Sequence, residues 1–98
     1  MTSWTRRALQ VPASHPTASG HFPGRSVVPG ALLLDEVALA LAGPGPLTFR
    51  AVKFLAPVQH GEPLELRWQN QDAGLCRFEI RDTEGQVLVL SGTLECMA

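Results

Sequence analysis

The stretch GHFPGRSVVPGALLLDEVALALAG, residues 20–43, changes character halfway along its length. Its first half is rich in glycine and proline and carries one histidine, His21. Its second half, residues 31–42, consists of alanine, leucine and valine apart from one acidic pair, Asp35-Glu36. Glycine and proline interrupt regular structure, whereas alanine and leucine favour helix. The stretch therefore predicts a loop followed by a helix that carries two carboxylates among apolar side chains.

The ends of this helix are marked by the sequence. Pro29 suits a first helical turn because its missing N–H would have no partner there, and Gly43 suits the end. The helix is apolar nearly all the way round, so we expect it to be buried on most sides. Adjacent helical residues point about 100° apart, so Asp35 and Glu36 cannot both face one small site. We assign Asp35 to a site and a structural or exposed position to Glu36.

The rest of the chain is typical of β-strands. Apolar and polar side chains alternate in several short runs, which are separated by turn-forming residues at 72–74 and 83–85. The expected strands cover residues 5–11, 47–56, 64–69, 76–81 and 86–95. The sequence therefore predicts an α+β fold, in which one strand and one helix precede an antiparallel meander of four strands. The simplest packing wraps this sheet around the helix, which is the hotdog architecture.

Length and composition limit the possible functions. A chain of 98 residues with 45% apolar residues predicts one globular domain, residues 1–98, which would gain by pairing with a second copy. A formal net charge of −1 argues against nucleic-acid binding. We see neither a membrane-spanning stretch nor a secretory signal, so we expect a cytoplasmic protein. Cys76 and Cys96 have no metal-binding spacing and are expected to pack as small apolar residues, and we expect no metal or cofactor.

Three short motifs within residues 20–43 follow one another in a fixed order: HFPG at 21–24, VVPG at 27–30 and LLLD at 32–35. This series resembles the active-site signature of the β-hydroxyacyl-acyl-carrier-protein dehydratases of fatty-acid synthesis, including the spacing between the histidine and the acid. Lys53-Phe54, Pro57-Val58 and Gly61 resemble a later segment of the same family. The resemblance extends over residues 20–94.

The resemblance implies a dimeric hotdog lyase that removes water from 3-hydroxyacyl thioesters and forms trans-2-enoyl thioesters. The substrate would be carried on acyl carrier protein or on coenzyme A. His21 matches the catalytic histidine and Asp35 the catalytic acid, and in relatives these two groups come from different chains. The Val27 carbonyl matches the group that orients the imidazole, and the Gly30 N–H matches the donor to the thioester oxygen.

The residue types fit this chemistry. A histidine with a reference pKa of about 6.5 accepts a proton at neutral pH. Apolar neighbours are expected to raise the pKa of Asp35, so that its protonated form can donate to the leaving hydroxyl. The N–H groups at the start of a helix can hold the developing negative charge, and Gly30 lets the thioester approach closely. Phe22 is expected to contact substrate, and Arg25 is the best candidate for contact with an acidic carrier protein.

One departure from the family keeps other functions open. Leu39 stands one helical turn after the acid, at a substrate-binding position where relatives carry a polar residue. Its replacement could alter substrate choice, and the short chain resembles compact accessory dehydratases of aryl-polyene and other specialised lipid pathways. A hotdog thioesterase would use Asp35 or Glu36 to activate water and would not need His21. A non-catalytic subunit that binds acyl thioesters is the third hypothesis.

Overall fold

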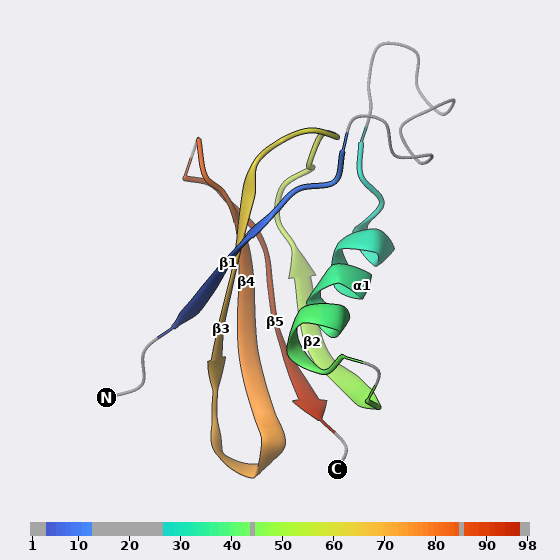
Figure 1. The fold of residues 1–98 in the computed structure, drawn as a ribbon, viewed down its shortest axis with the longest axis vertical. Helices are drawn as coiled ribbons and strands as arrows, with labels where there is room; N and C mark the ends of the chain where they lie inside the picture. The colour runs from blue at the N-terminus through green and yellow to red at the C-terminus, as the bar shows by residue number, and fades with distance from the viewer. Residues whose placement is uncertain (1–3, 13–26, 44, 85, 97–98) are drawn as a thin grey trace.

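The computed structural model describes residues 4–12, 27–43, 45–84 and 86–96. Within this part of the chain, one α-helix lies against a five-stranded antiparallel sheet (Figure 1), which confirms the predicted α+β hotdog fold. The elements are β1 (Thr5–Leu9), α1 (Gly30–Leu41), β2 (Leu47–Phe54), β3 (Leu64–Asn70), the short 3-10 turn η2 (Asp72–Gly74), β4 (Leu75–Asp82) and β5 (Leu88–Cys96).

The order of the strands in the sheet differs in one respect from the expected meander. Strands β3, β4 and β5 follow one another as antiparallel neighbours, but the full order is β1-β3-β4-β5-β2. The prediction that β2 precedes β3 in a continuous meander is therefore wrong. The connecting segment, residues 55–63, contains two prolines and does not form a hairpin. Instead, its Val58 carbonyl accepts a hydrogen bond of 2.8 Å from the Val28 N–H, just before α1.

The alternation predicted for the strands gives the sheet one apolar face. Leu66, Ile80 and Leu90 occupy paired positions on β3, β4 and β5, and all three are buried. Trp68, Phe78 and Gly92 form the next such row. A Cβ atom on Gly92 would lie 2.3 Å from the Ala51 carbonyl oxygen, so only glycine fits where β2 approaches β5.

The helix begins and ends close to the predicted residues. Pro29 is its N-cap, and at its C-terminal end the Gly43 N–H donates to the Ala38 carbonyl at 3.1 Å. Gly43 has a φ of +59°, which glycine adopts without strain. Among the described residues, no helix has the length and apolar character that crossing a membrane requires.

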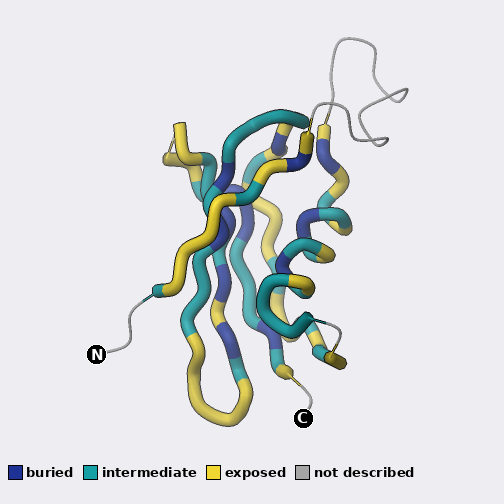
Figure 2. The backbone as a smooth tube through the Cα atoms, in the orientation of Figure 1, coloured by how far each residue is buried: buried dark blue, intermediate teal, exposed yellow. Residues whose placement is uncertain are grey.

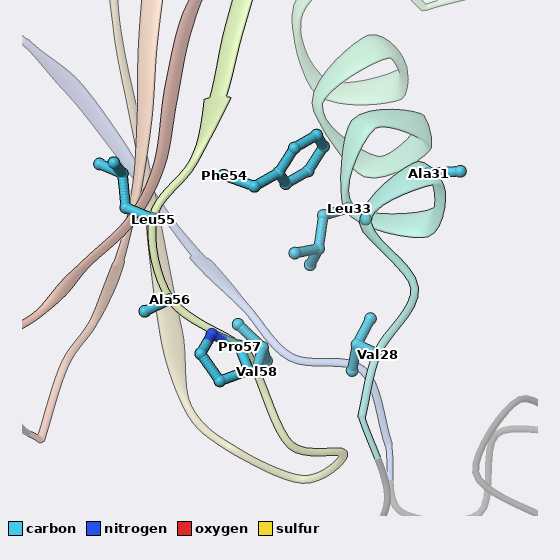
Figure 3. Close-up of a pocket in the computed structure, with 9 residues that line it drawn as sticks. Val28, Ala31, Leu33, Phe54, Leu55, Ala56, Pro57 and Val58 are labelled. Carbon is cyan, nitrogen blue, oxygen red and sulfur yellow. The ribbon is translucent and has the colours of Figure 1, made fainter. Parts of the chain in front are cut away.

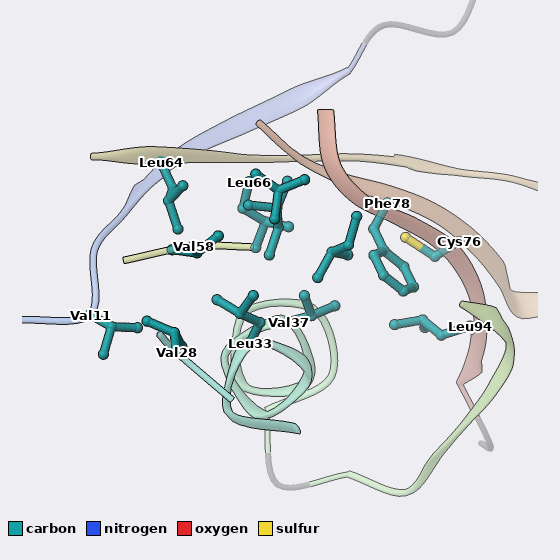
Figure 4. Packing of buried hydrophobic residues seen from close by; sticks show 13 residues of the cluster. Val11, Val28, Leu33, Val37, Val58, Leu64, Leu66, Cys76, Phe78 and Leu94 are labelled. Atoms are coloured by element: carbon teal, nitrogen blue, oxygen red, sulfur yellow. The ribbon is translucent and has the colours of Figure 1, made fainter. Parts of the chain in front are cut away.

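The helix is buried on one face only. Leu33 and Val37 point into the sheet (Figure 4), and the opposite side of α1 is exposed (Figure 2). Leu39 is 66% exposed, and Asp35 is also exposed. The expectation of burial on most sides is therefore wrong for a single chain, because five strands cover one side of the helix and leave the other open.

The core between sheet and helix is wholly apolar. Figure 4 shows 13 buried residues that meet there, and no polar or charged residue is buried in the described part of the chain. Cys76 belongs to this core, as predicted. Cys96 is exposed at the end of β5, so the prediction that both cysteines pack as apolar residues is right for Cys76 only.

Candidate active site

A cavity of about 530 Å³ lies where α1 begins (Figure 3). One side is formed by the start of the helix and the residues before it, and the other by the end of β2 and the segment that follows. Every residue of its lining is apolar or glycine: Val28, Gly30, Ala31, Leu33, Phe54, Leu55, Ala56, Pro57 and Val58. The cavity therefore suits an apolar group rather than a charged one.

Backbone hydrogen bonds hold the two sides of the cavity together. In addition to the bond between Val28 and Val58, Val27 forms an isolated antiparallel bridge with Gln59. The Leu55 and Ala56 N–H groups both donate to the Val89 carbonyl, at 2.8 and 3.2 Å. The start of α1 is thus anchored through residues 55–59 to strand β5.

Gly30 is the first residue of α1 and lines this cavity. The first N–H groups of an α-helix have no partner within the helix, and the helix dipole adds positive potential at this end. No acidic side chain lies in the first turn to neutralise it. The site therefore combines an apolar cavity with backbone donors suited to an oxygen that gains negative charge.

Asp35 lies outside the cavity of its own chain. It is exposed, and it makes no hydrogen bond or ion pair with any described residue. Ala31 precedes Asp35 by one helical turn on the same face of α1, and it does line the cavity. The row of side chains from Ala31 to Asp35 therefore runs from the cavity to the exposed face of α1. The low-polarity surroundings expected for Asp35 are absent from a single chain.

Leu39 and Glu36 belong to a different depression. It has a volume of about 340 Å³, lies between β1 and α1, and is also lined by Arg7 and Gln10. Leu39, expected at the substrate site, thus lies one helical turn beyond Asp35 and does not line the cavity within one chain. His21, Phe22 and Arg25 lie outside the described residues.

Two cavity residues, the last of β2 and the one after it, were not among the predicted site residues. Phe54 is 55% exposed and Leu55 54% exposed, and both line the cavity. The signal that could have found them is the Lys53-Phe54 pair, which the family resemblance already included. Its link to the site depends on β2 lying opposite the start of α1, which the predicted strand order did not specify.

A carboxyl group in the segment between β2 and β3 has a shifted pKa. Burial and the neighbouring Asp82 carboxylate raise the pKa of Glu62, although the Gln59 N–H, which donates to Glu62 Oε1 at 3.1 Å, opposes the shift. Residues 59–62 also carry the bridge to Val27, so this carboxyl group lies in the turn that supports the start of α1. Within the described ranges, no group of three histidine, cysteine or acidic side chains could hold a metal ion.

Comparison with known proteins places this geometry in a family. Residues 3–93 match the ApeI-like family, described as ApeI dehydratase. The chain is 33% identical to the 3-hydroxyacyl-[acyl-carrier-protein] dehydratase FabZ of Rhizorhabdus wittichii, over 80% of this chain and 60% of that protein. It is also 33% identical to FabZ of Variovorax paradoxus, over 88% of this chain and 69% of the relative. The aligned part is thus about 60–70% of the length of these two relatives.

Solved structures support the same fold. A chain of the dehydratase heterocomplex ApeI:P from Xenorhabdus doucetiae superposes with a TM-score of 0.75 at 22% identity, covering 97% of this chain and 88% of that chain. A 1,4-dihydroxy-2-naphthoyl-CoA thioesterase from Synechocystis superposes with a TM-score of 0.65 at 18% identity, covering 98% and 83%. The fold is therefore shared by enzymes of different activity, and it is the match over residues 3–93 that decides the family. This chain belongs to the ApeI-like dehydratase family.

Proposed function

We propose that this protein removes water from 3-hydroxyacyl thioesters, carried on acyl carrier protein, and forms trans-2-enoyl thioesters. The observation that carries the proposal is the apolar cavity that opens at the free N–H end of α1, beside Gly30. An acyl thioester has both parts that such a site suits, namely a hydrocarbon chain and a carbonyl oxygen that becomes negative during reaction. The FabZ relatives are named for this reaction.

The reaction needs three groups in defined roles. His21 takes the proton from C2 of the substrate, and the negative charge develops on the thioester oxygen beside the Gly30 N–H. Asp35, in its protonated form, donates a proton to the C3 hydroxyl, which leaves as water. The C2–H and C3–O bonds break and a C2–C3 double bond forms, so atoms and electrons balance without a cofactor. The Val27 carbonyl accepts from the imidazole and orients it.

We further assign Asp35 of each site to a second copy of the chain. Asp35 is exposed and does not line the cavity of its own chain, so we assign the carboxyl group of each cavity to a partner. Strand β2 stands at one edge of the sheet, and the exposed Phe54 and Leu55 lie at its end. Exposed edges and apolar patches of this kind favour association. A homodimer is therefore our preferred assembly, with Arg25 as the proposed contact for the carrier protein.

Incubation of the protein with 3-hydroxyacyl thioesters of varied length and carrier tests the activity. Enoyl absorbance without release of free thiol is the expected result. Free thiol without enoyl product would refute dehydration and support a thioesterase, which would use Asp35 or Glu36 to activate water. Binding of the acyl carrier protein with neither product would support a non-catalytic subunit instead.

A further inference from the structure

The ring of Phe54 lies directly against the first residue of α1. A Cβ atom built on Gly30 would be only 2.6 and 2.9 Å from two ring carbons of Phe54. Real Cβ atoms do not approach other atoms this closely, so the ring occupies the space that any larger residue at position 30 would need. Figure 3 shows the side chain extending from β2 toward the helix, over the cavity. The ring of Phe54 thus lies beside both the apolar cavity and Gly30, whose N–H is the proposed donor to the thioester oxygen.

Three other residues of the cavity wall, unlike Phe54, belong to the buried core. Leu33, Val28 and Val58 are almost completely buried, with exposed fractions of 3%, 4% and 1%, and they belong to the core. Phe54 is more than half exposed and does not belong to the core or to its partly buried surroundings. Its ring also makes no contact with another aromatic ring among the described residues, unlike Phe49 of the same strand, whose ring centroid lies 5.8 Å from that of Phe78.

We propose that Phe54 is a specificity-determining residue, whose ring limits the bulk of the acyl group that enters the cavity next to Gly30. This inference rests on the proposed function, because it takes the ligand of the cavity to be an acyl thioester. A thioester oxygen held at Gly30 places the adjoining acyl carbons beside the ring. A smaller side chain at position 54 leaves the buried core intact and enlarges the cavity, so bulkier acyl groups gain room and small ones lose contact.

A purely structural role for Phe54 gives a different expectation. If the ring only covered a contact between two copies of the chain, its truncation would weaken association and leave acyl preference unchanged. Measurement of molecular mass by light scattering, alongside acyl preference, separates the two roles.

The experiment compares Phe54→Leu with the matched variant Phe49→Leu, which makes the same change on the same strand but away from the cavity. The probes are two pantetheine thioethers that carry a 2-oxoalkyl group, one short and unbranched and one phenyl-bearing. They keep a carbonyl oxygen for the Gly30 N–H but can be neither dehydrated nor hydrolysed. Their dissociation constants are measured by calorimetry on the wild type and on both variants. For Phe54→Leu we expect the ratio of the two constants to shift about tenfold toward the phenyl-bearing probe.

Phe49→Leu is expected to lower thermal stability and leave the ratio at the wild-type value. Equal ratios in all three proteins, or no binding of either probe to the wild type, would overturn the inference. The proposed function is tested separately by product analysis on the wild type. A protein that binds the thioethers and changes preference with Phe54→Leu, yet forms no enoyl thioester, would refute the dehydratase activity alone.

Discussion

Two adjacent carboxylates on α1 have different surroundings. Asp35 is exposed on the row that leads from Ala31 and the cavity, whereas Glu36 is half-buried in the depression beside Arg7. The two side chains point in different directions, as the 100° between neighbouring helical residues requires, and the assignment of Asp35 to catalysis stays a prediction.

This difference makes Glu36→Gln a matched control for Asp35→Asn. Asparagine keeps the shape of Asp35 but cannot donate an acidic proton, so we expect turnover to fall by about 10²–10⁴-fold, the range usual for loss of a general acid. Glu36→Gln is expected to retain activity within about threefold, because that residue does not touch the reacting atoms. Initial rates of enoyl formation measure both, and circular dichroism checks the fold. Similar losses in the two variants would contradict the assignment.

Gly92 illustrates a residue whose role only the packed sheet reveals. A methyl group there would meet the Ala51 carbonyl oxygen at 2.3 Å and the Phe78 ring at 2.7 Å. We expect Gly92→Ala to lower the free energy of unfolding by about 1–3 kcal/mol, because β2 and the buried ring must both shift. Urea denaturation measures the change. Gly43→Asn serves as a control, because asparagine tolerates the positive φ and no atom lies within 4 Å of the added Cβ. An unchanged midpoint for Gly92→Ala would show that β2 does not lie so close to β5.

At the scale of elements, the segment between β2 and β3 supports both the cavity and the helix start. It contributes cavity residues from Leu55 to Val58 and holds Val27 and Val28 through backbone pairing. The Gln59–Glu62 hydrogen bond closes a turn within it. The stability of this turn should therefore depend on whether Glu62 is ionised.

The direction of that response follows from the raised pKa of Glu62. Burial lifts the pKa of Glu62 above its ordinary value of 4.5, so the folded protein favours the protonated carboxyl more than the unfolded chain does. The resulting stability is fully present below pH 4.5 and is lost as the pH rises through the raised value. Glutamine cannot ionise, so Glu62→Gln does not lose this stability. The difference in melting temperature between the variant and the wild type should therefore grow in favour of the variant as the pH rises through that interval. Thermal melts from pH 4 to 7 measure the difference, and a constant difference across this range would contradict the shift.

The elements themselves could be predicted from local signals. Glycine, proline and the change from a helical to a two-residue period marked α1 and the strands to within two residues. The position of β2 could not be predicted this way, because its pairing with β5 joins residues far apart in the chain. For the same reason Phe54 and Leu55 were not foreseen as cavity residues. Gly30, in contrast, was placed correctly at the helix start, because Pro29 marks that start locally.

At the scale of the whole molecule, the single chain leaves apolar surface uncovered. Leu39, Phe54 and Leu55 are each more than half exposed, and α1 has one open side. The apolar composition of the helix predicted burial all round, and one sheet covers only half of it. Composition could not show which surface a second copy covers, because that depends on the strand order and on the shape of the folded chain. We propose that a second copy covers this surface and that its Asp35 lies at the cavity.

Mixed dimers of two inactive variants test this arrangement most directly. His21→Ala and Asp35→Asn chains, each with a different affinity tag, are co-expressed, and the heterodimer is purified through both tags. If His21 and Asp35 of one site come from different copies, one of the two sites regains both groups. Dehydration of a 3-hydroxyacyl thioester by the heterodimer should then reach about half of the wild-type rate, since a two-fold dimer has two equivalent sites. A heterodimer as inactive as each variant alone would contradict a site shared between two copies.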